Sequence, residues 1–287
     1  MNREDFPALY KSADEHSANS QKYFFRTLKI QLGLLVIAAV LSGVNEATKF
    51  TAYLQAFTLL ASLGCSVFLY TQRFDRQWYA ARAVAESIKT ISWRYVVRSE
   101  PFNQDDPTVT VLFAKKLSQI VEQNQEVTRH FTSFLAAPQI TQQMKTYRSQ
   151  SLSNREKLYR DHRINDQLTW YENKAKENNK SYRNAFCLMI LSNAIAATFA
   201  ILRPEFLRST FWPTDVFVTF AAVGLTWMQT RRYSELAASY SLAAHEINII
   251  NEQSFEISTE ECFSRFVSDA ENAFSREHTQ WSAREDR

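Results

Sequence analysis

The feature that most restricts how this chain can fold is residues 50–72, a run of 23 residues without a charged side chain between Lys49 and Arg73. At 1.5 Å per residue, a helix of this length crosses a bilayer hydrocarbon core of ~30 Å. No proline occurs from residue 50 to residue 98, and past Arg73 the apolar residues become periodic. We therefore predict a membrane-spanning helix that continues into water as one amphipathic helix.

Three other segments repeat this pattern more weakly. Residues 28–44 form a short apolar run that Lys29 can extend by reaching toward the headgroups, residues 184–202 carry no charge, and residues 216–230 carry none over 15 positions. Short connections make neighbouring spans antiparallel. The predicted fold class is an all-α membrane protein with two antiparallel transmembrane helical hairpins, whose long helices extend into a cytosolic helical bundle. The predicted spans are about 28–44, 50–72, 184–202 and 213–230.

Composition narrows the remaining possibilities. Four Gly and six Pro in 287 residues leave few turns for sheets. The net charge of +3 is small, and no basic run interleaves with aromatic residues, so we expect no nucleic-acid partner. Cys65, Cys187 and Cys262 share no short spacing, which favours buried free thiols over a disulfide framework or a metal site.

The sequence contains no arrangement of residues that would make it an enzyme. No nucleophile lies beside a base, and no glycine loop is suited to phosphate. The five His residues are scattered, without a His or Cys partner at the spacing of a helical turn. We expect no catalytic residue, no cofactor and no metal.

Basic residues gather before the first and third predicted spans and after the second and fourth. Because Lys and Arg collect on the cytoplasmic side of a membrane, both termini and the long helices are expected in the cytoplasm. The basic residues are Lys22, Arg26, Lys29, Arg73, Arg76, Lys174, Lys176, Lys180, Arg183, Arg231 and Arg232.

A repeat is visible at an offset of 160 residues, which places Ala83 on Ala243 and Glu86 on Glu246. Spans, short loops and the helix that follows them keep the same order in both halves. We predict two units, residues 1–137 and 138–287. Beyond the spans, the predicted helices are 73–100 and 107–135 in the first unit, and 139–183, 231–255 and 259–283 in the second.

The same residues carry a family resemblance. The segment QWYAARAVAESIKTISWRYVVRSEPF, which holds Trp78, Arg82, Glu86, Lys89 and Trp93, is similar to the SLATT family, the SMODS- and SLOG-associating two-transmembrane domain. The second half resembles another branch of the family in LTWYENKAKENN, SELAASYSLAAHEIN and VSDAENAFSREHTQW. These segments hold Trp170, Tyr171, Tyr240, Glu246, Glu271, Glu277 and Trp281.

The resemblance covers essentially the whole chain and implies two family units in tandem. It further implies a multi-pass protein of the bacterial inner membrane that serves in antiviral defence. Such a domain is expected to be a pore-forming effector that oligomerises and permeabilises the membrane. The implied partners are membrane lipid, further copies of the chain, and a co-encoded protein that produces or senses a nucleotide.

A stripe of polar residues follows one face of the second predicted span, at Thr51, Gln55, Thr58, Ser62 and Ser66. Such a stripe lines a water-filled pore in some proteins. In others it is hydrogen-bonding contact between helices that approach closely. The other candidate pore-lining residues are Asn193, Thr219 and Thr226.

The family motifs suggest residues for packing or switching in the helical bundle: Trp78, Arg82, Glu86, Trp93, Trp170, Tyr171, Tyr240, Glu246, Glu271 and Trp281. Arg82 and Glu86 are one helical turn apart and are expected to pair, contributing ~0.3–0.5 kcal/mol if exposed. We expect the Trp residues to be packing anchors rather than platforms for a nucleotide.

Two functions remain open at this point. The first is an oligomeric pore that the bundled long helices hold closed until a signal rearranges them. The second is a non-conducting membrane scaffold that recruits cytosolic partners through the bundle. A lipid-modifying enzyme has no residues that would support it.

Overall fold

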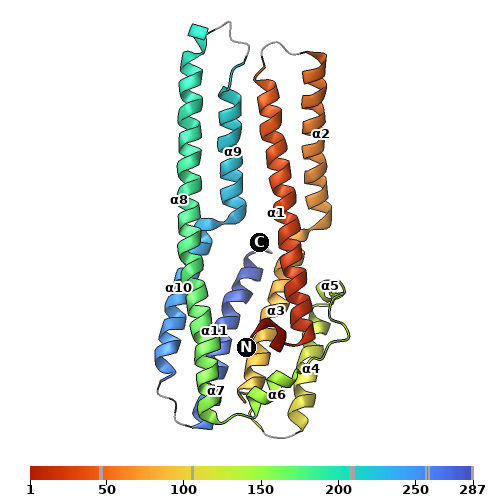
Figure 1. Ribbon diagram of the computed structural model, residues 1–287, viewed down its shortest axis with the longest axis vertical. Coiled ribbons are helices and arrows are strands. Elements are labelled where there is room, and N and C mark those ends of the chain that lie inside the picture. Colours follow the sequence, from red (N-terminus) through yellow and green to blue (C-terminus); the bar gives the residue numbers. More distant parts are fainter. Residues whose placement is uncertain (45–47, 105–106, 207–210, 256, 258, 286–287) are drawn as a thin grey trace. The chain divides into compact units, whose positions relative to one another are not determined.

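The structure is a computed structural model that describes residues 1–287 except 45–47, 105–106, 207–210, 256, 258 and 286–287, and of residues 276–285 only the helical backbone. The described residues form helices joined by turns, apart from an isolated antiparallel bridge between Val44 and Phe211 (Figure 1). The predicted all-α fold class is confirmed.

The chain divides into two compact units. Unit 1 comprises Met1–Lys22, Phe74–Tyr171 and Leu242–Arg287, and unit 2 comprises Tyr23–Arg73 and Glu172–Ser241. Three helices contribute residues to both units: α1 (Ala8–Ser42), α8 (Asn165–Leu202) and α10 (Tyr233–Gln253).

Unit 2 holds the apolar helices, with α9 (Thr214–Arg231) between α8 and α1, and α2 (Lys49–Gln72) on the other side of α1 (Figure 1). The Trp212 amide donates to the Gly43 carbonyl at 2.8 Å, which joins the start of α9 to the end of α1. At the other end of α9, Trp227 packs edge-on against Phe25 of α1. A 3-10 turn, η3 (Arg203–Phe206), follows α8.

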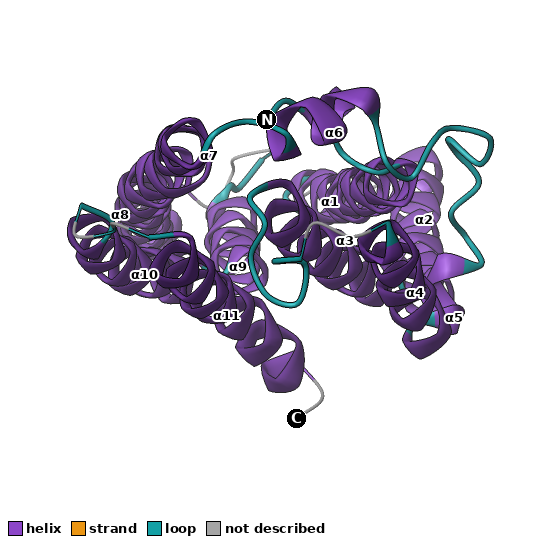
Figure 2. Cartoon of the chain, turned by 90° about the horizontal axis from the view of Figure 1, so that it is seen from below, coloured by secondary structure: helices purple, strands orange, loops and turns teal. Residues whose placement is uncertain are grey.

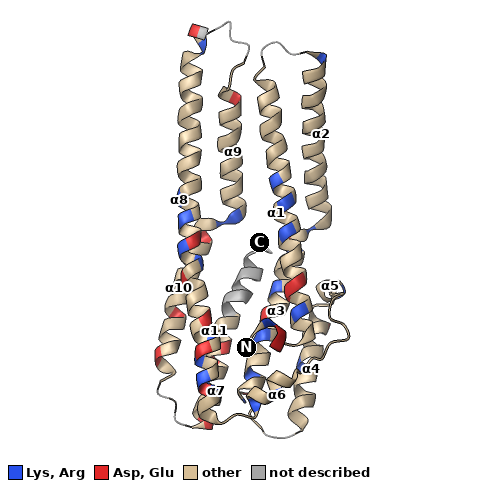
Figure 3. Ribbon diagram, viewed as in Figure 1, with Lys and Arg blue, Asp and Glu red and all other residues tan. Residues whose placement is uncertain are grey.

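Three helical stretches of the described chain are long and apolar enough to cross a membrane: Ala8–Ser42, Lys49–Val96 and Leu152–Glu205. The middle parts of α2 and α9 carry no charged residue (Figure 3). By this measure α9 is not one of the candidate spans of the described chain. A fourth crossing at residues 213–230 therefore stays a prediction.

The pattern of burial along α2 is the reverse of that in a water-soluble protein. Its buried side chains are Thr58 and Ser62. Seven of its large apolar side chains are 54% to 76% exposed, at Phe50, Tyr53, Phe57, Leu60, Leu63, Val67 and Tyr70. A contiguous apolar surface of this kind marks a contact with lipid or protein, because single exposed apolar residues are normal and long rows of them are not.

The predicted continuous helix through Arg73 is wrong. Arg73 adopts the left-handed region, with φ 48°, and its amide donates to the Leu69 carbonyl as the cap of α2. The helix α3 (Phe74–Val96) begins at the next residue. Arg232 caps α9 in the same conformation, with φ 50°, immediately before α10. The two halves of the chain thus share a helix break at a left-handed arginine, which no pattern in the sequence predicted.

The predicted helix over 107–135 is also shorter than expected. It is divided into α4 (Thr108–Gln123) and α5 (Gln125–Thr128), with Asn124 between them. The Asn124 side-chain amide donates to the Ile120 carbonyl at 2.8 Å, so the side chain occupies a carbonyl at the end of α4.

The long helix predicted over 139–183 is likewise interrupted. It consists of α6 (Gln142–Arg148), α7 (Leu152–Tyr159), a π-helical turn η2 (Arg160–Ile164), and the first part of α8. Thr141 caps α6 by accepting from the Met144 amide, and the Ser149 hydroxyl donates to the Thr146 carbonyl. Side chains that bond the local backbone compete with helix continuation, which explains the break.

Unit 1 is organised around α3, with α11 (Glu260–Glu285) on one side and α4 on the other (Figure 2). A short 3-10 turn, η1 (Arg3–Asp5), and α6 add further cover. The buried core includes Ala81, Val84, Ala85, Ile88, Trp93, Val96, Phe102, Phe113, Phe263 and Val267. In unit 1 the apolar side chains thus lie inside, as in a water-soluble helical bundle.

The cysteines differ from expectation in their burial. All three are free, but Cys187 and Cys262 are exposed and Cys65 is only partly covered. The neighbours of Cys187 in α8, Phe186 and Leu188, are exposed as well. An apolar segment therefore did not imply a buried thiol here, because the segment presents its apolar face outward.

Candidate functional site

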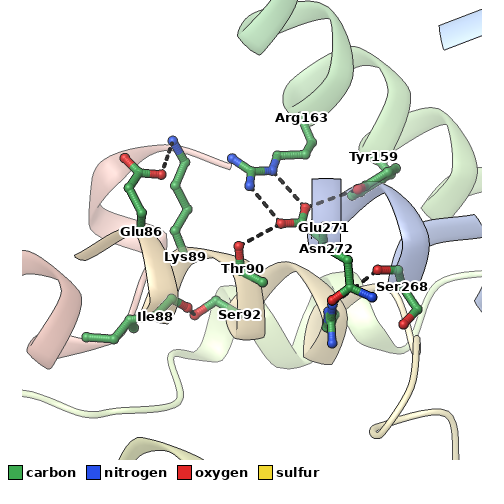
Figure 4. Close-up of polar contacts among 11 residues, drawn as sticks. Glu86, Ile88, Lys89, Thr90, Ser92, Tyr159, Arg163, Ser268, Glu271 and Asn272 are labelled. Atoms are coloured by element: carbon green, nitrogen blue, oxygen red, sulfur yellow. Dashed lines mark hydrogen bonds and ion pairs between the residues drawn. The ribbon is translucent and has the colours of Figure 1, made fainter. Parts of the chain in front are cut away.

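The main polar feature of unit 1 is a buried carboxylate, Glu271 of α11, whose side chain has 0% exposure. Arg163 of η2 donates to both of its oxygens, Nε to Oε1 at 2.8 Å and Nη2 to Oε2 at 2.7 Å. The Tyr159 hydroxyl donates to Oε1 at 3.0 Å, and the Thr90 hydroxyl donates to Oε2 at 2.9 Å. We call these four residues the buried polar junction (Figure 4).

The junction is a buried ion pair rather than a surface contact, although Arg163 Nη1 has no hydrogen-bond partner among the described residues. Each oxygen of Glu271 accepts two hydrogen bonds, so its charge is compensated without water. Burial alone would lower the pKa of Arg163, but the adjacent Glu271 carboxylate outweighs it and raises that pKa. Burial, together with the Glu271 charge, raises the pKa of Tyr159 well above its usual range. Arg163 and Tyr159 therefore keep their protons at physiological pH and remain donors to Glu271.

Further contacts continue the junction along α3 and α11. The Arg94 guanidinium donates to the Ser268 carbonyl at 3.1 Å and to the Asn272 side chain at 2.8 Å. Past the end of α3, the Ser99 hydroxyl donates to the Ser264 carbonyl at 2.6 Å. The two helices are thus held together by hydrogen bonds with directional geometry as well as by apolar packing.

Arg155 of α7 also connects elements of unit 1. Its side chain is buried and donates to the Val97 carbonyl at 2.8 Å, and it forms an ion pair with Glu260 at the start of α11. Val97 follows α3, so one arginine connects the end of α3, α7 and the start of α11. Like Arg94 and Arg163, Arg155 therefore contacts groups that are distant in sequence.

A second ionic group lies on α3, with Glu86 at its centre. Arg82 pairs with Glu86 at 2.6 Å, as the spacing predicted, and Lys89 approaches it at 3.8 Å. Asp14 of α1 reaches Arg82 at 3.7 Å. The Glu86 side chain is only 6% exposed, so this is a largely buried group and not a solvated surface pair. Burial lowers the pKa of Lys89, and the Glu86 carboxylate opposes that effect.

The aromatic motif residues occupy two kinds of place. Trp93 is buried and packs edge-on against Phe6 and against Tyr159 of the junction, at ring-centroid distances of 6.4 and 5.8 Å. Tyr171 is also buried. Trp78 and Trp170 are partly exposed; the Trp78 ring stacks on Tyr79, and its carbonyl accepts from Ser17 of α1.

The remaining motif residues stand apart from the junction. Glu246 is exposed on α10, and Tyr240 is partly exposed on the same helix. The side chains of Trp281 and Glu277 lie outside the described residues. Of the ten predicted packing or switch residues, the structure therefore brings Arg82 and Glu86 together, and places Trp93 and Glu271 in one packed region.

The polar stripe of α2 faces α1 within unit 2. The Gln55 side chain donates to the Ala38 carbonyl at 3.4 Å, and Ser66 accepts from Gln31 of α1 at 2.8 Å. Thr58 and Ser62 are buried, and their neighbour Thr51 bonds the start of its own helix through Thr48. The stripe thus makes hydrogen bonds between and within helices; a pore-lining role for it stays a prediction.

The candidate pore residues outside α2 show no such convergence. Asn193 and Thr226 are exposed and bond backbone carbonyls of their own helices, those of Met189 and Ala222. Thr219 is partly exposed.

Sequence reasoning missed three of the four junction residues, Thr90, Tyr159 and Arg163. It also missed that His16 of α1 and His130 stack at 5.9 Å in unit 1. Burial, followed by the charge of His130, lowers the pKa of His16, and a side-chain hydrogen bond between His16 and Gln77 opposes the shift. The residues described here contain no group of three or more His, Cys, Asp or Glu suited to holding a metal ion.

Comparison with known protein families decides the identity of the chain. Residues 7–156 match SMODS and SLOG-associating 2TM effector domain 3, and residues 159–281 match SMODS and SLOG-associating 2TM effector domain 1. The first match alone covers more than half of the chain. The chain belongs to the SLATT family. Curated proteins and solved structures gave no match to it.

The two SLATT domains in tandem confirm the resemblance seen in the motifs. The bounds of the two domains also show which domain each junction residue belongs to. Thr90 belongs to the first SLATT domain, and Tyr159, Arg163 and Glu271 belong to the second. The buried polar junction therefore ties one SLATT domain to the other inside unit 1.

Proposed function

We propose that this SLATT protein is a pore-forming membrane effector, held in a resting state by the contacts that join its two domains. The observation that carries the proposal is the reversed burial of α2, whose apolar side chains face outward while hydroxyl side chains lie inside. The family description names both two transmembrane helices and an effector role. Insertion in lipid would remove the apolar outer face of α2 from water. The polar inner face would supply side chains that can line a water-filled pore.

The proposed resting state depends on the buried polar junction. A bundle that must rearrange on a signal needs two arrangements of comparable free energy. Breaking the Arg163–Glu271 contact is costly unless both charges find new partners or water, so the closed arrangement does not open spontaneously. We propose that a nucleotide-producing or nucleotide-sensing partner of the SMODS or SLOG type supplies the free energy for opening, in a bacterial inner membrane under phage attack.

The test is dye release from liposomes that contain the purified chain. We expect release from wild-type protein on activation, and reduced release when Gln55, Thr58 and Ser62 are each changed to Leu. A matched control replaces Thr71, an exposed residue at the end of α2, with Leu. Liposomes that retain dye at high protein density, with candidate cyclic nucleotides and a co-encoded partner present, would contradict the proposal.

A second function, a non-conducting scaffold, is favoured by one observation. The hydrogen bonds of Gln55 and Ser66 are made to α1 of the same chain, which is what helix-to-helix adhesion requires. If the protein is a scaffold, the Leu variants are expected to bind its partner as the wild type does. Neither the wild type nor the variants would then release dye.

A further inference from the structure

The helix α10 carries an exposed apolar face in unit 1. Leu242 is 62% exposed and Ile249 is 60% exposed, and the exposed Glu246 lies between them on the same side of the helix. These positions are separated by four and three residues, which is the spacing of one helix face. The next face round the helix, at ~100° per residue, is buried through Ala243 and Ile247. The exposed face therefore belongs to a packed helix and not to a frayed end.

The repeat shows that this face departs from its counterpart. At the offset of 160 residues, Leu242 and Ile249 fall on Arg82 and Lys89 of α3. In the first domain these charged side chains pair with Glu86, and they are 39% exposed at Arg82 and 18% exposed at Lys89. In the second domain the same two positions are apolar and exposed. If both faces met only water, the charged residues would be expected at the more exposed positions. Apolar residues at exposed positions are therefore explained by a partner that covers them.

The outer face of α4 has matching chemistry. The inner face of α4 is buried through Val109, Phe113 and Leu117, and its outer face presents Val111, which is 70% exposed, beside Lys115. The basic residues of α4 are Lys115 and its neighbour Lys116. In contrast, α10 contains three Glu and neither Lys nor Arg. Each exposed face thus places a charge beside apolar side chains, Lys115 on α4 and Glu246 on α10.

One chain cannot bring these two faces together. Within unit 1, α4 and the part of α10 from Leu242 onward lie on opposite sides of α3 and α11 (Figure 2). We propose that the exposed face of α10 binds the outer face of α4 of a second copy of this chain. Because the two faces differ, the contact is head to tail, and it leaves a free face at each end for further copies. Repeated contacts of this kind close into a ring or extend into a filament.

The interface is tested on the full-length chain in detergent, by light scattering with size exclusion, which reports the mass of the protein. Wild type is expected to assemble beyond a single chain. Val111→Glu blocks the α4 face and Ile249→Glu blocks the α10 face, so each variant alone is expected to stay at the mass of one chain. Mixed together, they retain one intact pair of faces and are expected to stop at two chains.

A charge exchange measures the polar part of the contact. Glu246→Lys or Lys115→Glu is expected to raise the dissociation constant of self-association by about tenfold, and the two changes in one chain are expected to restore it. Leu135→Glu is the control, because Leu135 is 78% exposed in unit 1 but lies on neither face. Thermal unfolding of each variant confirms that it is folded.

Three results would overturn the proposal. The first is a wild-type chain that remains single at every concentration, which would assign the α10 face to another protein. The second is assembly of Val111→Glu alone, which would mean that α10 pairs with α10. The third is disruption by Leu135→Glu equal to that of the interface variants. None of these readings depends on conductance, so they separate this inference from the proposed pore.

Discussion

The helices α2 and α3 are consecutive in the chain, separated only by Arg73, yet they bury opposite kinds of side chain. The buried residues of α2 are Thr58 and Ser62, and its phenylalanines and leucines face outward. The buried residues of α3 are mostly Ala, Val, Ile and aromatic side chains, together with the polar Glu86, Thr90 and Ser92, and its exposed residue is Arg76. The contrast teaches that burial has to be judged against the surrounding solvent: α2 fits hydrocarbon, and α3 fits water.

The same contrast separates the polar groups. In unit 1 a buried charge is compensated by a full set of partners, as Glu271 is. In unit 2 the inner face uses neutral groups that bond nearby carbonyls, as Gln55 and Thr58 do. Burying a charge costs free energy unless it is paired, and neutral polar groups cost less to bury. The paired charge in unit 1 and the neutral polar groups in unit 2 both meet this requirement.

The largest expected effect is in unit 1, where Glu271→Ala leaves Arg163 buried without its carboxylate. We expect a loss of about 3–5 kcal/mol in the free energy of unfolding, because an uncompensated buried charge remains. Denaturant unfolding in detergent measures it. Glu246→Ala is the matched control, an exposed glutamate of α10 whose loss is expected to cost less than ~0.5 kcal/mol. Equal effects from both variants would contradict the role assigned to the junction.

The next effect tests the outward face of α2. Leu60→Arg places a charge on a residue that is 66% exposed in the middle of the predicted span. We expect insertion to be less favourable by about 2.5–3.5 kcal/mol, and the membrane-bound fraction to fall after extraction at high pH. Leu135→Arg, equally apolar and 78% exposed but in unit 1, is expected to leave that fraction unchanged. If both variants stay in the membrane, α2 does not face lipid.

A smaller effect is expected where α1 meets α9 in unit 2. A methyl group added at Gly43 would lie 2.8 Å from the Trp212 carbonyl oxygen and from the Phe211 ring, so the backbone would have to shift. We expect Gly43→Ala to lower stability by about 1–3 kcal/mol. Gly64→Ala on α2 meets nothing within 4 Å and serves as the control. Thermal unfolding that ranks Gly64→Ala as the worse change would refute the packing described for Gly43.

The smallest expected effect is a histidine-based pH dependence in unit 1, which contains all five His residues of the chain. The pKa of His16 is lowered by burial and by His130, so the unfolded chain binds its proton more readily than the folded chain. Stability is therefore complete above the unfolded pKa of about 6.5 and falls as pH drops through it. His16→Gln should flatten this part of the curve, and the exposed His245→Gln should leave it intact. Unfolding measured from pH 5 to pH 8 distinguishes the two.

Local patterns were enough to predict α2 and the Arg82–Glu86 pair. The charged residues on either side of the charge-free run predicted the bounds of α2 to within one residue. A spacing of four residues puts Arg82 and Glu86 on one helix face, where they pair. The same reasoning failed at Arg73, because a left-handed backbone angle at a non-glycine residue leaves no mark in the sequence. It failed at Asn124 because a single side chain that bonds backwards ends the helix.

The buried polar junction was beyond local patterns for a different reason. Its members come from three separate segments, and Thr90 and Glu271 are 181 residues apart. Arg163 lies in a polar segment where a solvated arginine is the ordinary expectation. Only the family motif singled out Glu271, and nothing in the sequence pointed to its partners. Such contacts follow from tertiary packing, which one sequence does not display.

The π-helical turn Arg160–Ile164 has a consequence for how this contact can be broken. A π turn holds one more residue than an α turn in nearly the same axial length, so it resets the angle at which Tyr159 and Arg163 leave the helix axis. Deleting His162, which is exposed and takes no part in the contact, would rewind the turn and rotate one of the two donors by ~100° away from their shared acceptor. A deletion that removes none of the hydrogen-bonding groups would then be enough to break the contact between the two SLATT domains.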